Sequence, residues 1–261
     1  MSYPSPLTTR LALAGALLFT APPLLASDAW QRLEPARALV GDAVPEGDGL
    51  VLELPHVSED GSAVPLTVRF EPVLEDDAIA SIHLFATGNP YPEIAGFHFT
   101  EQAARPEVST RVRLNESQRV VAVAVSREGR VWTSEREVRV TVSGCLIRGD
   151  EETPEALANP RVSLPDFRAG EPGEVRTLIT HPMETGLREG PDGEVLPRYI
   201  IETFRVSLDG ETAFEAELHP SVSANPYLRF YLTPQAEGEA LFEWQDDSGE
   251  RAEYRTELTL S

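Results

Sequence analysis

Short segments in which apolar and polar residues alternate dominate the chain from Leu50 to the C-terminus. The alternation is clear in residues 64–70, 80–84, 108–114 and 138–142. Because side chains of a strand point alternately to its two faces, each segment presents one apolar face. Turn residues separate the segments and helical periodicity is almost absent. The pattern therefore predicts an all-β fold built of sandwiches.

Two segments carry more specific information. In residues 119–125 every position after Arg119 is apolar, so both faces of the segment are apolar, which predicts a central strand covered on both sides. Asp209 and Gly210 separate two alternating segments, 204–208 and 212–218, and this dipeptide is typical of a hairpin turn.

The character of the chain changes between Ser143 and Pro160, where glycines, prolines and acidic residues occur without periodicity. We interpret residues 143–160 as a linker that carries Cys145. The chain then divides into a signal peptide at 1–26, a first sandwich at 27–142, this linker, and a second sandwich at 161–261, so that two domains follow in tandem.

The N-terminus resembles a secretory signal. Arg10 precedes a short apolar run at 11–20, and small residues suited to cleavage lie near Ala26. The run is too short to span a bilayer as a helix, so we expect a soluble periplasmic protein without a membrane partner after cleavage. The alternative is an uncleaved amphipathic anchor.

The charge balance narrows the range of partners. The chain has 43 acidic residues against 22 basic ones, all arginine, and a net charge of −21. Nucleic acid and anionic lipid are therefore disfavoured, and a basic partner is favoured. The alternative explanation of the charge is solubility.

The chain has one cysteine, Cys145, which therefore cannot form an internal disulfide. It follows the last expected strand of the first sandwich by three residues, whereas an inert cysteine normally lies within an apolar period. Gly144 and Gly149 would give this segment freedom to move. A thiolate there could attack a sulfur electrophile and hold the product. A buried thiol and an intermolecular disulfide remain alternatives.

Catalytic patterns are absent from the sequence. The five histidines are scattered singly, without the spacing of a zinc site, and no phosphate-binding or dinucleotide motif occurs. A cysteine hydrolase would need folding to bring a base such as His181 to Cys145. We therefore expect a carrier rather than an enzyme, with no cofactor and no metal.

A long polar loop at 183–197 is rich in glycine, and long loops on rigid sheets often bind partners. Met183, Glu184, Gly186 and Arg188 are its candidate partner-binding residues. Plain surface variation is the alternative.

Several long stretches resemble two protein families. VSTRVRL (108–114), VVAVAV (120–125) and VWTSEREVRVTVSGC (131–145) are similar to SoxY, the carrier subunit of thiosulfate oxidation. THPMETG (180–186), PRYIIETFRVSLDG (197–210) and LHPSVSANPYLRFYL (218–232) are similar to its partner SoxZ. The resemblance implies a fused SoxYZ-like protein with two immunoglobulin-like sandwiches, in which Cys145 matches the carrier cysteine.

The resemblance also implies a function. Sulfur intermediates would be attached to Cys145 while other periplasmic sulfur-oxidation proteins oxidise and hydrolyse them. Single-domain relatives end in a free arm, GGCGG, whereas Leu146 and Ile147 follow Cys145 here. Fused proteins of this type resemble carriers found alongside quinoprotein dehydrogenases. The alternative is thus a non-covalent docking module for such a dehydrogenase or a c-type cytochrome.

Overall fold

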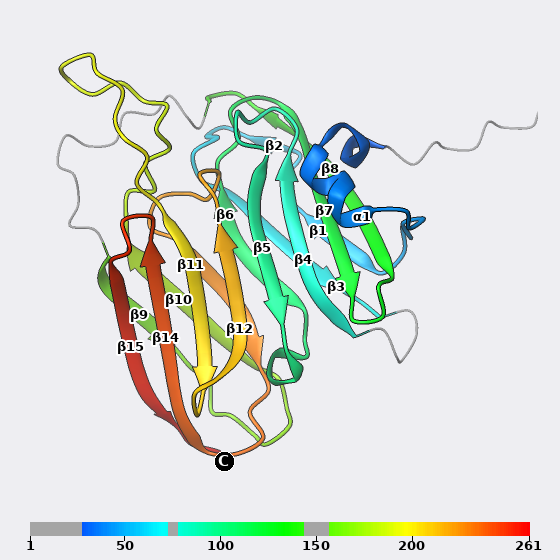
Figure 1. Cartoon of the computed structure of the whole chain (residues 1–261), viewed down its shortest axis with the longest axis vertical. Helices are drawn as coiled ribbons and strands as arrows, with labels where there is room; N and C mark the ends of the chain where they lie inside the picture. Colours follow the sequence, from blue (N-terminus) through cyan, green and yellow to red (C-terminus); the bar gives the residue numbers. More distant parts are fainter. Residues whose placement is uncertain (1–27, 73–77, 144–156) are drawn as a thin grey trace, which may run out of the picture.

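The computed structural model describes residues 28–72, 78–143 and 157–261. They form two β-sheets that pack face to face, with one short α-helix and two 3₁₀ turns (Figure 1). The expected fold class, all-β with immunoglobulin-like sandwiches, is confirmed. The expected signal peptide lies outside the described residues, and no helix within them is long and apolar enough to cross a membrane.

The first half of the chain supplies the elements η1 (Ala29–Arg32), α1 (Glu34–Val40), β1 (Leu50–Glu53), β2 (Val57–Ser58), β3 (Val64–Phe70), β4 (Ile79–Ala86), β5 (Glu93–Phe99), η2 (Glu101–Ala103), β6 (Glu107–Val112), β7 (Gln118–Ser126) and β8 (Val131–Val140). The second half supplies β9 (Ala158–Ser163), β10 (Gly173–Thr180), β11 (Ile201–Leu208), β12 (Glu211–Leu218), β13 (Tyr227–Leu232), β14 (Gly238–Asp246) and β15 (Arg251–Leu258). Most of these strands fall where the alternation placed them.

The strand β7 is covered on both faces, as its sequence predicted. One face belongs to the core between the sheets, and Val121 and Val123 on the other face pack beneath the N-terminal helix α1. The sequence did not predict this helix. Pro35 lies in its first turn, a position that suits proline because no hydrogen bond is lost there, and Gly41 ends it with φ of 57°.

The hairpin between β11 and β12 also confirms its prediction. Asp209 and Gly210 both have positive φ, at 49° and 82°, which is the backbone of the tight turn that matches strand twist. β5 was not predicted, because Gly96 and His98 interrupt its apolar pattern.

Both sheets run through both halves of the chain. The larger sheet has the order β15-β14-β11-β12-β5-β4-β7-β8-β2, and the smaller has the order β1-β3-β6-β13-β10-β9. The halves meet where β12 pairs with β5, from Phe214↔Phe99 to Leu218↔Ala95, and where β13 meets β6 at Arg229↔Ser109. We call these two strand contacts the seam. The two expected sandwiches thus lie edge to edge and share their sheets.

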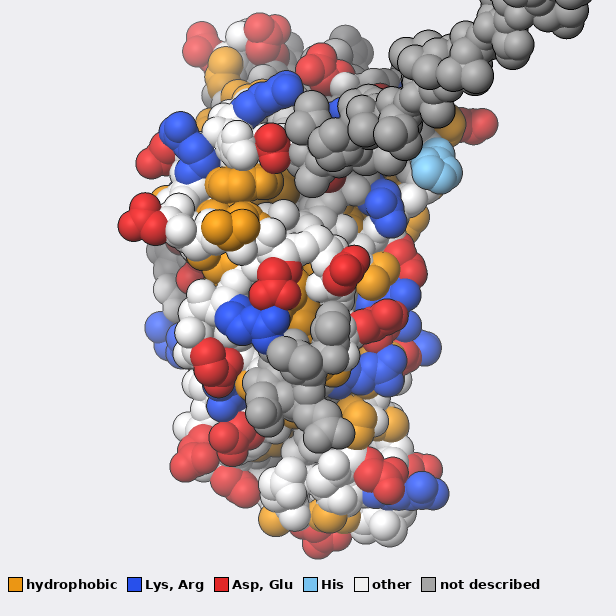
Figure 2. Space-filling model, turned by 90° about the vertical axis from the view of Figure 1, so that its right-hand side faces the viewer, with side chains coloured by type: hydrophobic (Ala, Val, Ile, Leu, Met, Phe, Trp, Pro, Cys, Tyr) orange, Lys and Arg blue, Asp and Glu red, His pale blue; other side chains and the backbone are white. Residues whose placement is uncertain are grey.

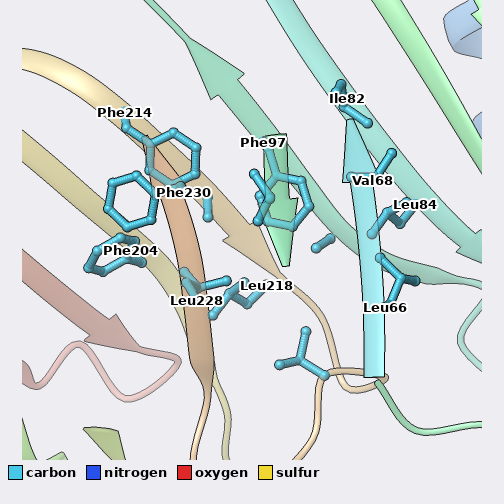
Figure 3. Close-up of a cluster of buried hydrophobic side chains, with 14 of the residues drawn as sticks. Leu66, Val68, Ile82, Leu84, Phe97, Phe204, Phe214, Leu218, Leu228 and Phe230 are labelled. Carbon is cyan, nitrogen blue, oxygen red and sulfur yellow. The ribbon is translucent and has the colours of Figure 1, made fainter. Parts of the chain in front are cut away.

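Aromatic side chains fill the core beside the seam (Figure 3). Phe214 on β12 stacks on Phe230 of β13, with ring centroids 4.3 Å apart and planes 9° apart. It also lies 6.3 Å from Phe97 and 5.7 Å from Phe99, both on β5. Its ring therefore joins the two sheets and the two halves at one point.

A polar network crosses the seam on the outer face of the smaller sheet. Arg229 on β13 forms ion pairs of 3.0 Å with Glu107 on β6 and 3.2 Å with Glu174 on β10, and donates to Ser109 Oγ at 2.7 Å. Elsewhere the surface carries side chains of several types. Figure 2 shows acidic and arginine side chains interspersed over the visible face, with hydrophobic side chains in small groups between them.

Candidate functional site at the cysteine end

Cys145, Gly144 and Gly149 lie outside the described residues, so the carrier role of the thiol and the flexibility of its segment stay predictions. The structure does describe the chain on both sides of this segment. It ends at Ser143 after β8 and resumes at Leu157 before β9.

Hydrogen bonds hold the chain that leaves β8 in place as far as Val142. Ser117 Oγ accepts from Val140 N at 3.0 Å, Ser58 O accepts from Thr141 N at 3.1 Å, and Val142 O accepts from Gly61 N at 2.9 Å. The cysteine is thus three residues beyond a fixed point of the fold.

The returning chain enters β9 at the same end of the molecule. Ala158 pairs with Thr180, the last residue of β10, which leads directly into the 183–197 loop. Gly61, which binds Val142, accepts from Leu114 N at 2.8 Å, and the neighbouring Arg113 donates to Pro182 O at 3.0 Å. These hydrogen bonds connect the chain that leaves β8 with Pro182, which lies two residues beyond Thr180, the partner of Ala158.

We call this part of the molecule the cysteine end. It comprises residues 56–62, 87–92, 113–117, 140–143, 181–199 and 219–225 and lies at the top of Figure 1, where residues 181–199 project beyond the sheets.

Met183 does not belong to the surface of the loop, contrary to our expectation for this residue. Its side chain is 0% exposed, and its sulfur accepts from Ile201 N at 3.3 Å. Its backbone oxygen accepts from the guanidinium of Arg113, and its φ is 49°. Because an arginine of the first half holds its backbone, Met183 anchors the loop in the core instead of contacting a partner.

The other three predicted loop residues shape the loop from within. Glu184 and Arg188 form an ion pair of 2.8 Å with each other, and the Glu184 backbone exchanges two hydrogen bonds with Tyr199. Gly186 has φ of 78°, and a Cβ there would lie 3.2 Å from Arg198, so glycine is needed. A role of these residues in partner binding stays a prediction.

His181 lies at the cysteine end but is 0% exposed. Its Nδ1 accepts from Met183 N at 3.0 Å, and its Nε2 has no hydrogen-bond partner among the described residues. Burial lowers the pKa of His181 to about 4, so the ring is neutral at ordinary pH. Because it is enclosed, the imidazole is placed to position the loop rather than to meet a substrate.

The structure brings together two other histidines that looked isolated in the sequence. His83 on β4 and His98 on β5 lie 5.5 Å apart between ring centroids, at the seam, where His98 Nε2 is 3.5 Å from Glu217 Oε1. Burial, and then His98 and His219, lower the pKa of His83 to about 4. The register of the β4–β5 hairpin is the signal that could have found this pair, since it pairs Ser81 with His98.

In the described residues, no group of three histidine, cysteine or acidic side chains is arranged to hold a metal ion.

Comparison with known families identifies both halves. Residues 36–145 match the model of the sulfur oxidation protein SoxY, and residues 163–257 match that of the sulphur oxidation protein SoxZ. The SoxY match ends at the position of Cys145. No curated protein matches the chain.

Solved structures give only distant likenesses. A superoxide reductase (neelaredoxin) from Ignicoccus hospitalis is 19% identical, with a TM-score of 0.31, over 35% of this chain and 80% of its own. A putative superoxide reductase from Thermotoga maritima is 23% identical, with a TM-score of 0.32, over 36% of this chain and 87% of its own. Likenesses of this size carry no functional meaning. The two family matches follow in order and together cover most of the chain, which therefore belongs to the SoxY and SoxZ families of sulfur-oxidation proteins as a fusion of both.

Proposed function

We propose that this protein is a periplasmic carrier that holds a sulfur intermediate covalently on Cys145 and presents it to partner redox enzymes. The observation that carries the proposal is the SoxY match, which extends to position 145 and so includes the cysteine. The fold supports it, because both described flanks of the cysteine segment are held at one end of the molecule. The partners would meet the cargo there.

Attachment of a sulfur intermediate to Cys145 requires a thiolate and a partner protein that accepts electrons. The thiolate of Cys145 is the nucleophile, and its proton passes to water. With thiosulfate as cargo, a bond forms between Sγ and the terminal sulfur, and two electrons leave. A c-type cytochrome can accept them one at a time. Other sulfur-oxidation proteins then hydrolyse the bound group, so no step requires a catalytic group of this chain.

The cellular setting follows from the same proposal. The expected signal peptide at 1–26 would deliver the protein to the periplasm, where c-type cytochromes and quinoprotein dehydrogenases also work. The net charge of −21 favours a basic partner surface over nucleic acid or anionic lipid.

Intact-mass analysis of protein purified from its host tests the carrier role. We expect an added mass that a thiol reductant removes and that Cys145→Ser abolishes. Because the chain has one cysteine, a thiol reagent also reports on this position alone. The matched control is Ser143→Cys combined with Cys145→Ser, which moves the thiol by two residues and should reduce loading. If Cys145→Ser supports sulfur oxidation in cells as well as the wild type, the docking-module function replaces the carrier.

Reach limits the kind of pocket that can receive the cargo. Cys145 is three residues beyond Val142, so an extended segment places it at most about 10 Å from that fixed residue. The chain continues after the cysteine through Leu146 and Ile147, so the segment that enters a partner is wider than a free terminal arm of glycines. We therefore expect an open groove in the partner, or cleavage of the linker to release an arm. Loading by a deep-tunnel partner, as fast for the uncleaved protein as for a free-arm carrier, would contradict this expectation.

A further inference from the structure

Large exposed hydrophobic side chains are concentrated at the cysteine end. Six such residues occur in the described part of the chain: Val44, Val57, Tyr91, Val142, Leu187 and Val195. All except Val44 lie at this end.

Strand pairing and hydrogen bonds establish these positions. Val57 pairs with Arg139 near the end of β8, and Val142 binds Gly61. Tyr91 O accepts from Ser221 Oγ at 3.1 Å. Single exposed apolar residues need no explanation, but a concentration of them at one end of a molecule is typical of an interface.

The hairpin that carries Leu187 and Val195 is ordered from within, although it projects from the sheets (Figure 1). Leu196 N donates to Arg188 O at 2.9 Å, and Gly190 N donates to Glu194 O at 2.8 Å. Leu187 is 42% exposed and Val195 is 59% exposed. The hairpin thus fixes two apolar side chains in solvent, which reduces the ordering cost of binding a partner.

The base of the hairpin is as firmly held as its arms. Arg113 donates to the carbonyl oxygens of Pro182 and Met183. Arg198 forms ion pairs of 3.0 Å with Glu202 and 3.2 Å with Asp247. A surface mounted in this way presents the same shape before and after binding.

Uncompensated negative charge surrounds these apolar side chains. Six exposed carboxylates at the cysteine end have no ion-pair partner among the described residues: Glu59, Asp60, Glu116, Glu189, Asp192 and Glu194. Arg188 and Arg198 are already paired with acidic residues, and Arg139 is an exposed cation at the margin. On the sheet faces, by contrast, arginines pair with many of the acidic side chains. The end therefore attracts a cationic surface.

We propose that the cysteine end is a preformed docking surface for a protein whose complementary face has an apolar centre ringed by arginine or lysine. Leu187 and Val195 on the projecting hairpin are its anchors, and the six carboxylates form its acidic rim. The surface rests on the proposed carrier function, since it brings the partner to the flanks of Cys145. Nucleic acid and anionic membranes share the negative charge of this end and are repelled by it.

The test measures kcat/KM for loading of thiosulfate onto Cys145 by the c-type cytochrome of the host's sulfur-oxidation system, with the full-length chain. Leu187→Gln combined with Val195→Gln should lower kcat/KM about tenfold, because anchor residues dominate interface energies. Val44→Gln, at the most exposed valine outside the cysteine end, should leave it unchanged. Both sites are exposed, so folding should persist, as thermal melts will verify.

A second set of variants tests the rim. Neutralising Glu189, Asp192 and Glu194 to their amides should lower kcat/KM about fivefold at low salt and flatten its decline between about 20 and about 200 mM NaCl. The matched control neutralises three exposed acids elsewhere, Asp42, Glu128 and Glu211.

The outcomes separate the surface from the carrier. Failure of the wild type to load, with normal labelling of Cys145 by a small thiol reagent, counts against the proposed function. If the wild type loads and both hairpin variants load equally fast, the docking surface is wrong while the carrier stands. Equal losses in the hairpin variants and their controls would also overturn it, because the effect would then be one of total charge or polarity.

Discussion

Replacement of Phe214 by alanine should destabilise both halves of the protein together. Its buried ring contacts Phe230 and Phe204 in the second half, at centroid distances of 4.3 and 6.3 Å, and Phe97 and Phe99 in the first half, at 6.3 and 5.7 Å. Loss of a buried phenylalanine costs about 3–5 kcal/mol, and each aromatic pair adds about 0.5–1.5 kcal/mol to simple burial. We therefore expect a loss of about 4–5 kcal/mol.

Urea unfolding followed by tryptophan fluorescence reports on each half separately. Trp132 is buried in the first half and Trp244 in the second, so Phe substitutions at Trp30 and at one of these two leave a single reporter. Since both sheets cross the seam, Phe214→Ala should shift both reporters by the same amount. A shift at Trp244 with an unchanged transition at Trp132 would refute cooperative unfolding across the seam.

Phe242 is the matched control, because it is equally buried but contacts Phe204 and Tyr254 within the second half. Phe242→Ala should lower stability by about 3–5 kcal/mol. In double-mutant cycles with Phe97→Ala, Phe214→Ala should show a coupling of about 0.5–1.5 kcal/mol and Phe242→Ala less than about 0.5 kcal/mol. Equal couplings would mean that the ring contacts at the seam do not join the halves.

Three further changes address the polar parts of the fold. The pKa values of His83 and His181 are lowered from 6.5 to about 4, so between these values the unfolded chain binds protons that the folded protein does not. The free energy of unfolding should therefore fall by about 3 kcal/mol for each ring as the pH drops from about 6.5 to about 4. NMR titration midpoints near 6.5 for these two rings would contradict this prediction. Arg229→Ala should cost about 1–3 kcal/mol in urea unfolding, because the buried Glu107 and the partly buried Glu174 each lose an ion pair; a change below about 0.5 kcal/mol would refute that role. Gly96→Ala should lower stability by about 1–3 kcal/mol, because a Cβ at position 96 would lie 2.9 Å from His83 Nδ1. At Gly47, the control, a Cβ meets open space, so Gly47→Ala should leave stability unchanged, and equal effects of the two substitutions would rule out crowding against His83 as the cause.

Local patterns in the sequence determined the elements of this protein. Period-two alternation identified strands such as β3, β10 and β13, because one face of each is buried and the other is not. The doubly apolar pattern of 119–125 identified a strand covered on both sides, and Asp209-Gly210 identified a turn that needs positive φ. The long stretches similar to SoxY and SoxZ identified the families.

Some local features could not be predicted from the sequence, because they depend on contacts with other parts of the chain. β5 carries Gly96 and His98 on its outer face, so its pattern looks too weak for a strand until β4 and β12 flank it. Met183 belongs to a stretch with the composition of a surface loop, yet Arg113 and the core hold it inside. The contacts with β12 and with Arg113 join residues that are far apart in the sequence, so no local pattern reveals them.

Only the tertiary structure decided how the halves join and what lies at the cysteine end. The pairing of β12 with β5 connects residues more than a hundred positions apart, and it depends on packing such as that of Phe214 on Phe99 rather than on any local pattern. Contacts between the halves, such as those of Arg113 with Pro182 and Met183, place the base of the 181–199 hairpin beside the chain that leaves β8. Strand alternation fixes which face of a segment is buried, but the partner across each sheet edge is selected by side chains that meet only when the whole core forms.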